Sequence, residues 1–385
     1  MKAAAALVRT EDPGQAARQA VKQARAELGE EPAFAVLFAS QHFHVSAQAL
    51  MATVTEQLGP MPLIGCIAES VAGNTHEVES EPAVSLWLAA GVGPVETFAM
   101  EFTRTSGGGA FGGYRFEPDR PGVCLLISDP FTFPAEYLLA HLNEHAPGTL
   151  VMGGMASGGL GAQRSRLFLD GKVLNSGAVG AYLPEAQIHP LVSQGCRPIG
   201  DPFTVTAAEG NLVHELGGQP AMNRLQDLAA SLSDDERQQL AQGVQVGMVI
   251  NEYGSGRRQG DFLIRGILGA QPETGAIAVG DEVEIGQTLQ FHVRDADSAD
   301  QELRRLLEQE AKDLGGQRPA GALLFTCNGR GLRMFPQPSH DTGLIASVLG
   351  DVPVAGFFCG GELGPVGGRN YVHTFTASVA VFPGQ

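Results

Sequence analysis

Apolar and polar residues alternate along this chain in blocks of two kinds. Short apolar runs bounded by glycine or proline predict buried β-strands. Longer stretches with apolar residues at helical spacing predict helices that bury one face. In the stretch from Val8 to Leu28, for example, Ala17, Ala20, Val21 and Leu28 fall on one helical face. The pattern therefore predicts strands and helices in alternation.

The two ends of the chain carry the same pattern. The stretch from Val293 to Leu314 repeats the one from Val8 to Leu28: Val-Arg ends a strand, a helix follows, and a glycine and a proline lead into an apolar strand. That strand is AFAVLFAS at 33–40 in one copy and AGALLFTC at 320–327 in the other. We expect a duplicated unit, with its two copies related by a pseudo-twofold rotation.

A third and looser copy lies in the middle of the chain. It consists of GVCLLISDP at 122–130, a helix from about 134 to 145, TLVMGGMASGG at 149–159 and SGAVGAYL at 176–183. Each copy reads strand, helix, strand, strand, with a glycine-rich turn after its second strand. The sequence therefore predicts an α+β fold, in which duplicated strand-helix-strand-strand units form mixed sheets covered by helices.

The segment between the middle and last copies differs in kind. It begins with a β-rich stretch, continues in a helix over about 219–232, and reaches the polar run SDDERQQLAQG at 233–243. Short strands such as VGMVINE, GDFLIRGILG and TLQFHVRD follow. The polar run predicts a domain boundary, which divides the chain into residues 1–235 and 236–385.

The charge and the cysteine content limit the possible binding partners and the cellular compartment. The chain has 25 basic and 42 acidic residues, a formal charge of −17, which argues against binding to a nucleic-acid backbone. Its five cysteines include no Cys-x-x-Cys pair, so we expect no disulfide framework and a reducing compartment. No apolar run approaches the ~18 residues that a membrane span needs. We therefore expect a cytoplasmic protein without a membrane partner.

The strand ends of the last copy hold the predicted ligand site. Cys327, Asn328, Arg330 and Gly331 follow one strand, and Glu362 follows the next. If these strands are neighbours, both turns open at one edge of the sheet. Arg330 would then hold a carboxylate and Glu362 an amine, as a zwitterionic ligand such as an amino acid requires.

Other interpretations of the same residues stay open. Arg330 could instead pair with a structural carboxylate, such as Glu362 or Asp341. Cys327 could act as a catalytic nucleophile, with His340 as its base and Asp341 orienting that base. We predict no catalytic residue, because an inert thiol is the commoner fate of a single cysteine at a strand end.

The middle copy contributes one further candidate. Asp129 ends its LLISD strand, in the position that Cys327 occupies in the last copy, and we predict that it binds ligand. For a metal, His42 and His44 alternate along the chain, but no third ligand can be named. No metal site is predicted, and the cofactor stays unknown.

Several stretches together resemble the FIST family, whose members have an N-terminal and a C-terminal FIST domain. The matching stretches are LFASQHF, PLIGCIAES, GGMASGG, VSQGCRPIGDPFTVT, GDFLIRGILG, LLFTCNGRG and AGFFCGGELGP. The resemblance implies a bacterial sensory domain that binds a small ligand, with amino acids as candidates. Some relatives bind haem and sense nitric oxide, which gives an alternative. The chain carries no kinase, cyclase or F-box segment, so the resemblance implies a stand-alone sensor that signals to a partner protein.

Overall fold

The chain folds into two compact units in the computed structural model. The described residues are 1–384, apart from 106–107, 119, 121, 160, 242, 251 and 253–261. Unit 1 consists of Met1–Val192, Leu303–Val372 and Thr376–Gln385, and unit 2 of Ser193–Glu302 and His373–Phe375. Unit 1 thus draws on both of the predicted sequence domains. The first residues of the GDFLIRGILG stretch, 260 and 261, lie outside the described residues.

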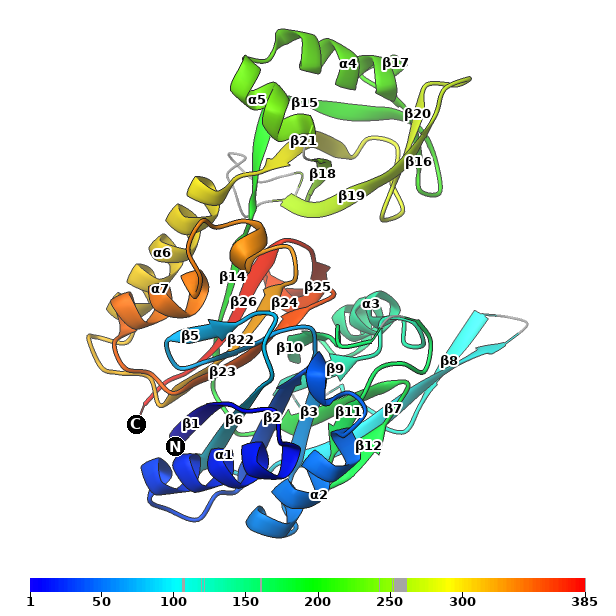
Figure 1. The fold of residues 1–385 in the computed structure, drawn as a ribbon. Helices are drawn as coiled ribbons and strands as arrows, with labels where there is room; N and C mark the ends of the chain where they lie inside the picture. Colours follow the sequence, from blue (N-terminus) through cyan, green and yellow to red (C-terminus); the bar gives the residue numbers. More distant parts are fainter. Residues whose placement is uncertain are drawn as a thin grey trace. The chain divides into compact units, whose positions relative to one another are not determined.

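Three mixed sheets and their helices make up unit 1, which confirms the predicted α+β class (Figure 1). Sheet 1 has the order β1 (Lys2–Arg9), β6 (Ala83–Ala90), β2 (Phe34–Ser40), β3 (Leu63–Ala68), β11 (Leu167–Leu169) and β12 (Lys172–Leu174). Strands β2 and β3 are parallel, whereas β6 is antiparallel to both β1 and β2. Helices α1 (Pro13–Leu28) and α2 (Ala47–Leu58) cover one face.

Sheets 2 and 3 repeat this arrangement. Sheet 2 has the order β8 (Gly108–Gly112), β7 (Glu96–Thr105), β13 (Ala178–Leu183), β9 (Val123–Ser128), β10 (Leu150–Met155), β24 (Glu362–Val366) and β25 (Arg369–His373), with α3 (Ala135–His145) packed on it. Sheet 3 has the order β14 (His189–Gln194), β26 (Thr376–Phe382), β22 (Gly321–Cys327), β23 (Val354–Cys359), β4 (Val71–Gly73) and β5 (His76–Val78), with α6 (Ala296–Asp313) and α7 (His340–Leu349). The three predicted copies are confirmed.

Each copy lends its own short hairpin to the sheet of another copy. Hairpin β4–β5 follows β3 of the first copy but joins sheet 3, β11–β12 follows β10 but joins sheet 1, and β24–β25 follows β23 but joins sheet 2. The exchange is cyclic among three copies, so no two copies trade hairpins with each other. The expected twofold relation between the ends of the chain is therefore wrong, because that relation requires a mutual exchange.

A shared core holds the three sheets together. One cluster of buried side chains takes residues from all three, including Trp87, Phe38, Phe325 and Phe357, while each sheet packs its other face against its own helices. Trp87 is fully buried, and its indole N–H donates to the Pro353 carbonyl over 3.3 Å. The strands are apolar on both faces because both faces are covered.

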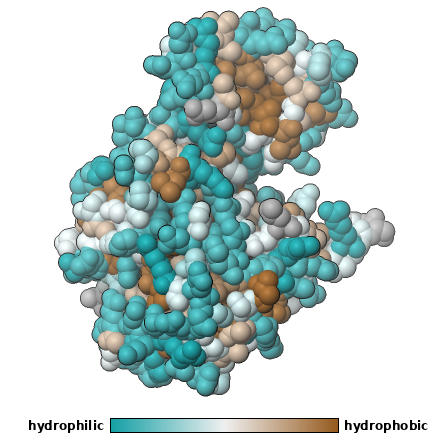
Figure 2. Space-filling view, in the orientation of Figure 1, coloured by the Kyte–Doolittle hydropathy of each residue, from teal (hydrophilic) through white to brown (hydrophobic). Residues whose placement is uncertain are grey.

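Unit 2 is inserted into the third copy, between β14 and α6. Its sheet has the order β15 (Cys196–Glu209), β21 (Thr288–Arg294), β18 (Val244–Val249), β19 (Phe262–Gln271), β20 (Ala276–Val279), β16 (Leu212–Leu216) and β17 (Gln219–Pro220), and a pairing of β15 with β16 closes six strands into a ring. Helices α4 (Ala221–Ser231) and α5 (Asp234–Ala241) complete it. The strand that ends in Val-Arg before α6 is thus β21 of unit 2, whereas β14 takes the place of β1 in the repeat. Figure 2 shows apolar side chains gathered on the visible face of unit 2, whose exposed large apolar residues are Leu268 and Ile285.

Candidate functional site

The two predicted strand ends lie side by side in sheet 3 of unit 1. Strands β22 and β23 are parallel and in register, with Cys327 opposite Cys359. The Asn328 N–H donates to the Cys359 carbonyl over 2.9 Å. The two glycine turns therefore open at the same edge of one sheet, as the sequence predicts.

Arg330 is fully buried and forms a two-pronged ion pair with Asp341. Its Nε lies 2.9 Å from Oδ2 of Asp341, and its Nη2 lies 2.7 Å from Oδ1. Burial alone would raise the pKa of Asp341, but the Arg330 charge and the hydrogen bonds of this carboxylate outweigh burial and lower it. Thr326 also donates to Asp341 over 2.7 Å. Of the two alternatives for Arg330, this geometry matches the structural carboxylate.

Two more carboxyl groups are buried near this pair. Glu362 accepts from the backbone and the hydroxyl of Thr376, and burial raises its pKa to about 8, although the Thr376 hydrogen bonds and, less strongly, the Cys327 thiol partly lower it. Glu77 of β5 accepts from the Thr342 N–H, and burial followed by the charge of Asp341 raises its pKa to about 7. Both groups titrate near neutral pH.

Several polar atoms of this strand-end cluster lack a hydrogen bond of normal geometry within the described part of the chain. They are Asn328 Oδ1, Arg330 Nη1, Glu77 Oε2 and Glu362 Oε1, and all four are buried. Such atoms in a native protein call for an explanation, for instance an internal water or a ligand.

Gly331 and Asp129, the remaining two predicted ligand-binding residues, each have a role in the local structure. Gly331 has φ +56°, in the left-handed region that favours glycine, and a Cβ there would lie 2.6 Å from Oε1 of Glu79. Asp129 follows β9 in sheet 2, fully buried, and accepts from the Ser165 hydroxyl over 2.7 Å and the Thr132 hydroxyl over 2.5 Å. These hydrogen bonds fix the loop that follows β9. As ligand-binding residues, both stay predictions.

The catalytic alternative gains no support from the described contacts of His340. Its Nδ1 lies 2.9 Å from Oδ1 of Asp341, and its ring stacks on Phe335 with centroids 3.4 Å apart. Asp341 itself is committed to Arg330. Among the described residues, no three histidine, cysteine or acidic side chains are grouped as metal ligands.

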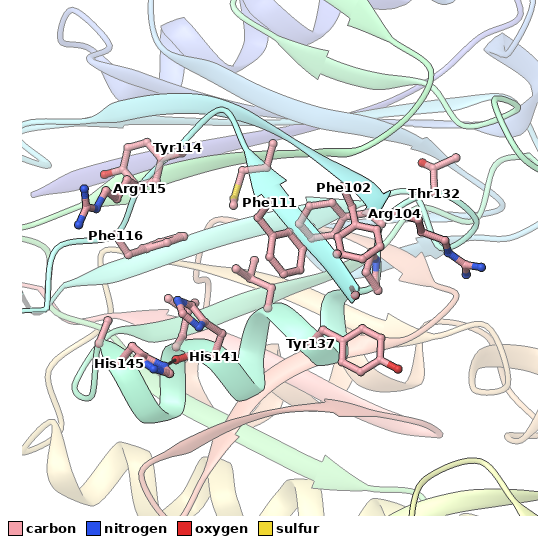
Figure 3. A pocket seen from close by; sticks show the side chains of 18 of the residues that line it. Phe102, Arg104, Phe111, Tyr114, Arg115, Phe116, Thr132, Tyr137, His141 and His145 are labelled. Atoms are coloured by element: carbon pink, nitrogen blue, oxygen red, sulfur yellow. Dashed lines mark hydrogen bonds between the residues drawn. The ribbon is translucent and has the colours of Figure 1, made fainter. Parts of the chain in front are cut away.

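A large cavity lies elsewhere in unit 1, between the β7–β8 hairpin and helix α3 (Figure 3). Phe102 of β7 and Phe111 of β8 are opposite each other in the hairpin, with ring centroids 5.1 Å apart. A Cβ on Gly109 would lie 2.1 Å from the Phe102 ring, so this glycine lets the ring lie against β8. The hairpin thereby presents an aromatic surface.

Helix α3 supplies the opposite wall. It buries Leu138 and Leu142 against sheet 2 and turns Tyr137, His141 and His145 outward. The two imidazole rings stack, with centroids 4.2 Å apart, because residues four apart share a helix face. Figure 3 shows Tyr137 at one end of the cavity and the two histidines at the other.

Tyr114 and Phe116 close a third side of this aromatic pocket. Tyr114 stacks on Phe98 with centroids 4.1 Å apart, and Phe116 meets Phe98 edge to face. The cavity measures about 1600 Å³. The sequence pattern did not single out this cavity, although a signal is present: five aromatic residues fall within 98–116, a stretch rich in glycine.

Comparison with known families identifies the class of protein. The FIST N domain matches residues 33–219, and the FIST C domain matches residues 221–365. The chain therefore belongs to the FIST family, a family of sensory domains.

Relatives with this organisation occur in mycobacteria. An uncharacterized protein of Mycobacterium tuberculosis is 49% identical over 372 residues, which covers 96% of this chain and 97% of the relative. An uncharacterized protein of Mycobacterium bovis is 48% identical over 383 residues, 99% of each chain. Within the described part of the chain, no helix has the length and apolar character that crossing a membrane demands.

Proposed function

We propose that this protein is a stand-alone sensor that binds a small molecule with an apolar body in the aromatic pocket of unit 1. The observation that carries this proposal is the cavity of about 1600 Å³ walled by aromatic side chains. Two of them, Tyr137 and Phe131, are 68% and 49% exposed. Large apolar side chains gathered around an open cavity commonly mark a binding site.

The position of the pocket suits a sensor. The β7–β8 hairpin lies at the edge of sheet 2 and contains glycines at 108, 109, 112 and 113. A ligand that packs between this hairpin and α3 would contact both elements and so favour one arrangement of the two. The hairpin held in that arrangement would then be the surface that a partner protein recognises.

The strand-end cluster is a second candidate for the ligand. The unpartnered atoms of Asn328, Arg330 and Glu362 support it, because an amino acid could donate to and accept from them. In that arrangement Arg330 would contribute only Nη1, since Asp341 occupies its other two donors. Cys327 and Gly331, which flank Asn328 and Arg330 in the chain, would then lie close to the ligand.

A neutral fluorescent probe tests the first proposal. We expect N-phenyl-1-naphthylamine to bind saturably, and Tyr137→Ala to weaken its affinity about 3- to 10-fold through lost contact area. Leu332→Ala is the matched control, because Leu332 is 54% exposed in unit 1 but does not line the pocket. Absence of saturable binding, or equal affinity in both variants, would overturn the proposal.

An amino-acid thermal-shift screen tests the second candidate. If an amino acid raises the melting temperature of the protein, Asn328→Ala should abolish that shift and Tyr137→Ala should leave it unchanged. The reverse pattern would place the amino acid in the aromatic pocket.

A further inference from the structure

We propose that the aromatic pocket selects organic anions, in which an apolar body of aromatic size carries a carboxylate, sulfonate or similar group. This inference rests on the proposed function, because it specifies the chemical class of the ligand for that pocket. Nothing in the family assignment or in the names of the relatives indicates a charge preference.

The charge of the pocket lining differs in sign from that of the chain. The lining contains Arg104, Arg115, His141 and His145, and none of its described residues is aspartate or glutamate. The chain as a whole has a formal charge of −17. A basic lining is therefore unexpected from composition, and it attracts an anion to a protein whose net charge repels one.

The two arginines are available to a ligand. Among the described residues, the side chain of neither Arg104 nor Arg115 forms a hydrogen bond or an ion pair, and both residues are exposed at the pocket rim. Their neighbour Arg120 contrasts with them, because its Nη2 lies 2.5 Å from Oε1 of Glu96. An uncommitted guanidinium presents a fork of donors that matches a carboxylate or sulfonate.

The nearby carboxylates do not neutralise this rim. Five glutamates lie on the hairpin, on α3 or in the loop after β8, and none of them is among the lining residues: Glu96, Glu101, Glu117, Glu136 and Glu144. Glu96 and Glu117 line a smaller neighbouring pocket with Arg115, but Glu96 is held by Arg120 and by the Tyr114 hydroxyl, which donates to it over 3.1 Å. Glu144 Oε2 lies 4.0 Å from Nδ1 of His145, a ring nitrogen that also donates to the His141 carbonyl over 3.1 Å. The Nε2 atom of His145 is left for a ligand.

The anionic group belongs at one particular end of the pocket. Figure 3 shows Arg115, His141 and His145 at the same end, with Phe116 between them, whereas Arg104 lies at the opposite end. Three nitrogen-bearing side chains, one from the loop after β8 and two from α3, thus lie at one end of the pocket. An apolar body extending from there would lie under Phe111 and Phe102.

A matched pair of probes tests the anion preference. 8-Anilino-1-naphthalenesulfonate and N-phenyl-1-naphthylamine share the same rings and differ only in the sulfonate. We expect the sulfonate to bind on the order of 10-fold more tightly at low salt, as one charge-assisted contact predicts. High salt should reduce the ratio, because the arginine is exposed.

Arg115→Gln should lower the preference for the sulfonate to about 3-fold or less and leave the affinity for the neutral probe unchanged. Arg18→Gln is the control, because Arg18 is an exposed arginine of α1 outside the pocket. Equal affinity for the two probes, or equal effects of the two substitutions, would overturn the anion preference while the pocket itself stands. Failure of both probes to bind would overturn the proposed function.

Discussion

The strand-end cluster and the aromatic pocket are opposite kinds of place in the same unit. In the cluster, charged side chains are buried: Arg330 and Glu362 are both 0% exposed, and Arg330 is held by Asp341. In the pocket, apolar rings are exposed and the arginines at the rim have no described partner. Charged residues are usually exposed and large apolar residues usually buried, so each site contains the residue type expected in the other.

The two sites differ in the free-energy cost of using their side chains to bind a ligand. A buried charge must be paired, and once paired it is difficult to redirect toward a ligand. An exposed aromatic ring next to a cavity has lost little on folding and gains contacts when a ligand arrives. We therefore expect substitutions in the cluster to change mainly stability, and substitutions in the pocket to change mainly binding.

The largest expected loss of stability comes from breaking the ion pair between Arg330 and Asp341. Arg330→Met leaves Asp341 buried without its partner and should lower the free energy of unfolding by about 3–5 kcal/mol. Replacing both residues, Arg330→Met with Asp341→Leu, should cost less than the single change, because no unpaired charge remains. Urea titration followed by the fluorescence of Trp87, the only tryptophan and a core residue of unit 1, measures both. If Arg330→Met is as stable as the parent protein, the pair is not a structural element.

The next effect depends on pH. Burial holds the pKa of Glu362 at about 8 and that of Glu77 at about 7, above the ~4.3 of an unfolded glutamate. The folded state therefore binds these protons more tightly, and the free energy of unfolding should fall as pH rises from about 4.5 to 8. Asp341, with its lowered pKa, acts in the opposite sense and only below the ordinary pKa of an aspartate.

The parent protein should lose on the order of 3 kcal/mol of unfolding free energy between pH 5.5 and 8.5 through Glu362, and Glu362→Gln should remove this loss because the amide cannot ionise. Urea titrations of both proteins at the two pH values give the comparison. An equally steep pH dependence in Glu362→Gln would show that Glu362 does not titrate in this window.

The smallest stability effect should come from the pocket. Gly109→Ala places a methyl group against the Phe102 ring and should lower the free energy of unfolding by less than about 1 kcal/mol, since the hairpin is exposed. The displaced ring should nevertheless weaken probe binding. Gly112→Ala is the control, because a Cβ there meets no atom within 4 Å. Equal probe affinity in the two variants would separate Phe102 from the binding surface.

Much of unit 1 could be predicted from local pattern. The three copies, helices α1 and α3, and the shared edge of β22 and β23 all follow from apolar spacing and glycine positions, because these elements are regular and bury continuous apolar faces. The strand-end residues could be named as candidates for the same reason, because they directly follow two of these regular strands. Which carboxylate pairs with Arg330 stayed open, because that choice depends on the packing of α7 against the sheet.

The hairpin exchange and the pocket could not be predicted in this way. Strands β4 and β5 have three residues each, and their partner β23 lies roughly 280 residues further along the chain, so no local signal links them. The pocket is built from a glycine-rich hairpin on which Phe98, Met100 and Phe102 follow the period of a strand. Sequence spacing alone does not show whether such residues fill a core or line a cavity.

The cyclic exchange of hairpins also bears on how this chain is made. A ribosome adding about 5–20 residues per second needs about 15–60 s between completing β5 and completing β23. During that interval, the sheet-3 partner of β4 does not yet exist, and sheet 2 likewise waits for β24. The nascent protein therefore carries unpaired strand edges for most of its synthesis, and such edges pair readily with other chains. We expect its yield in cells to depend on chaperones that cover these edges until the last copy emerges.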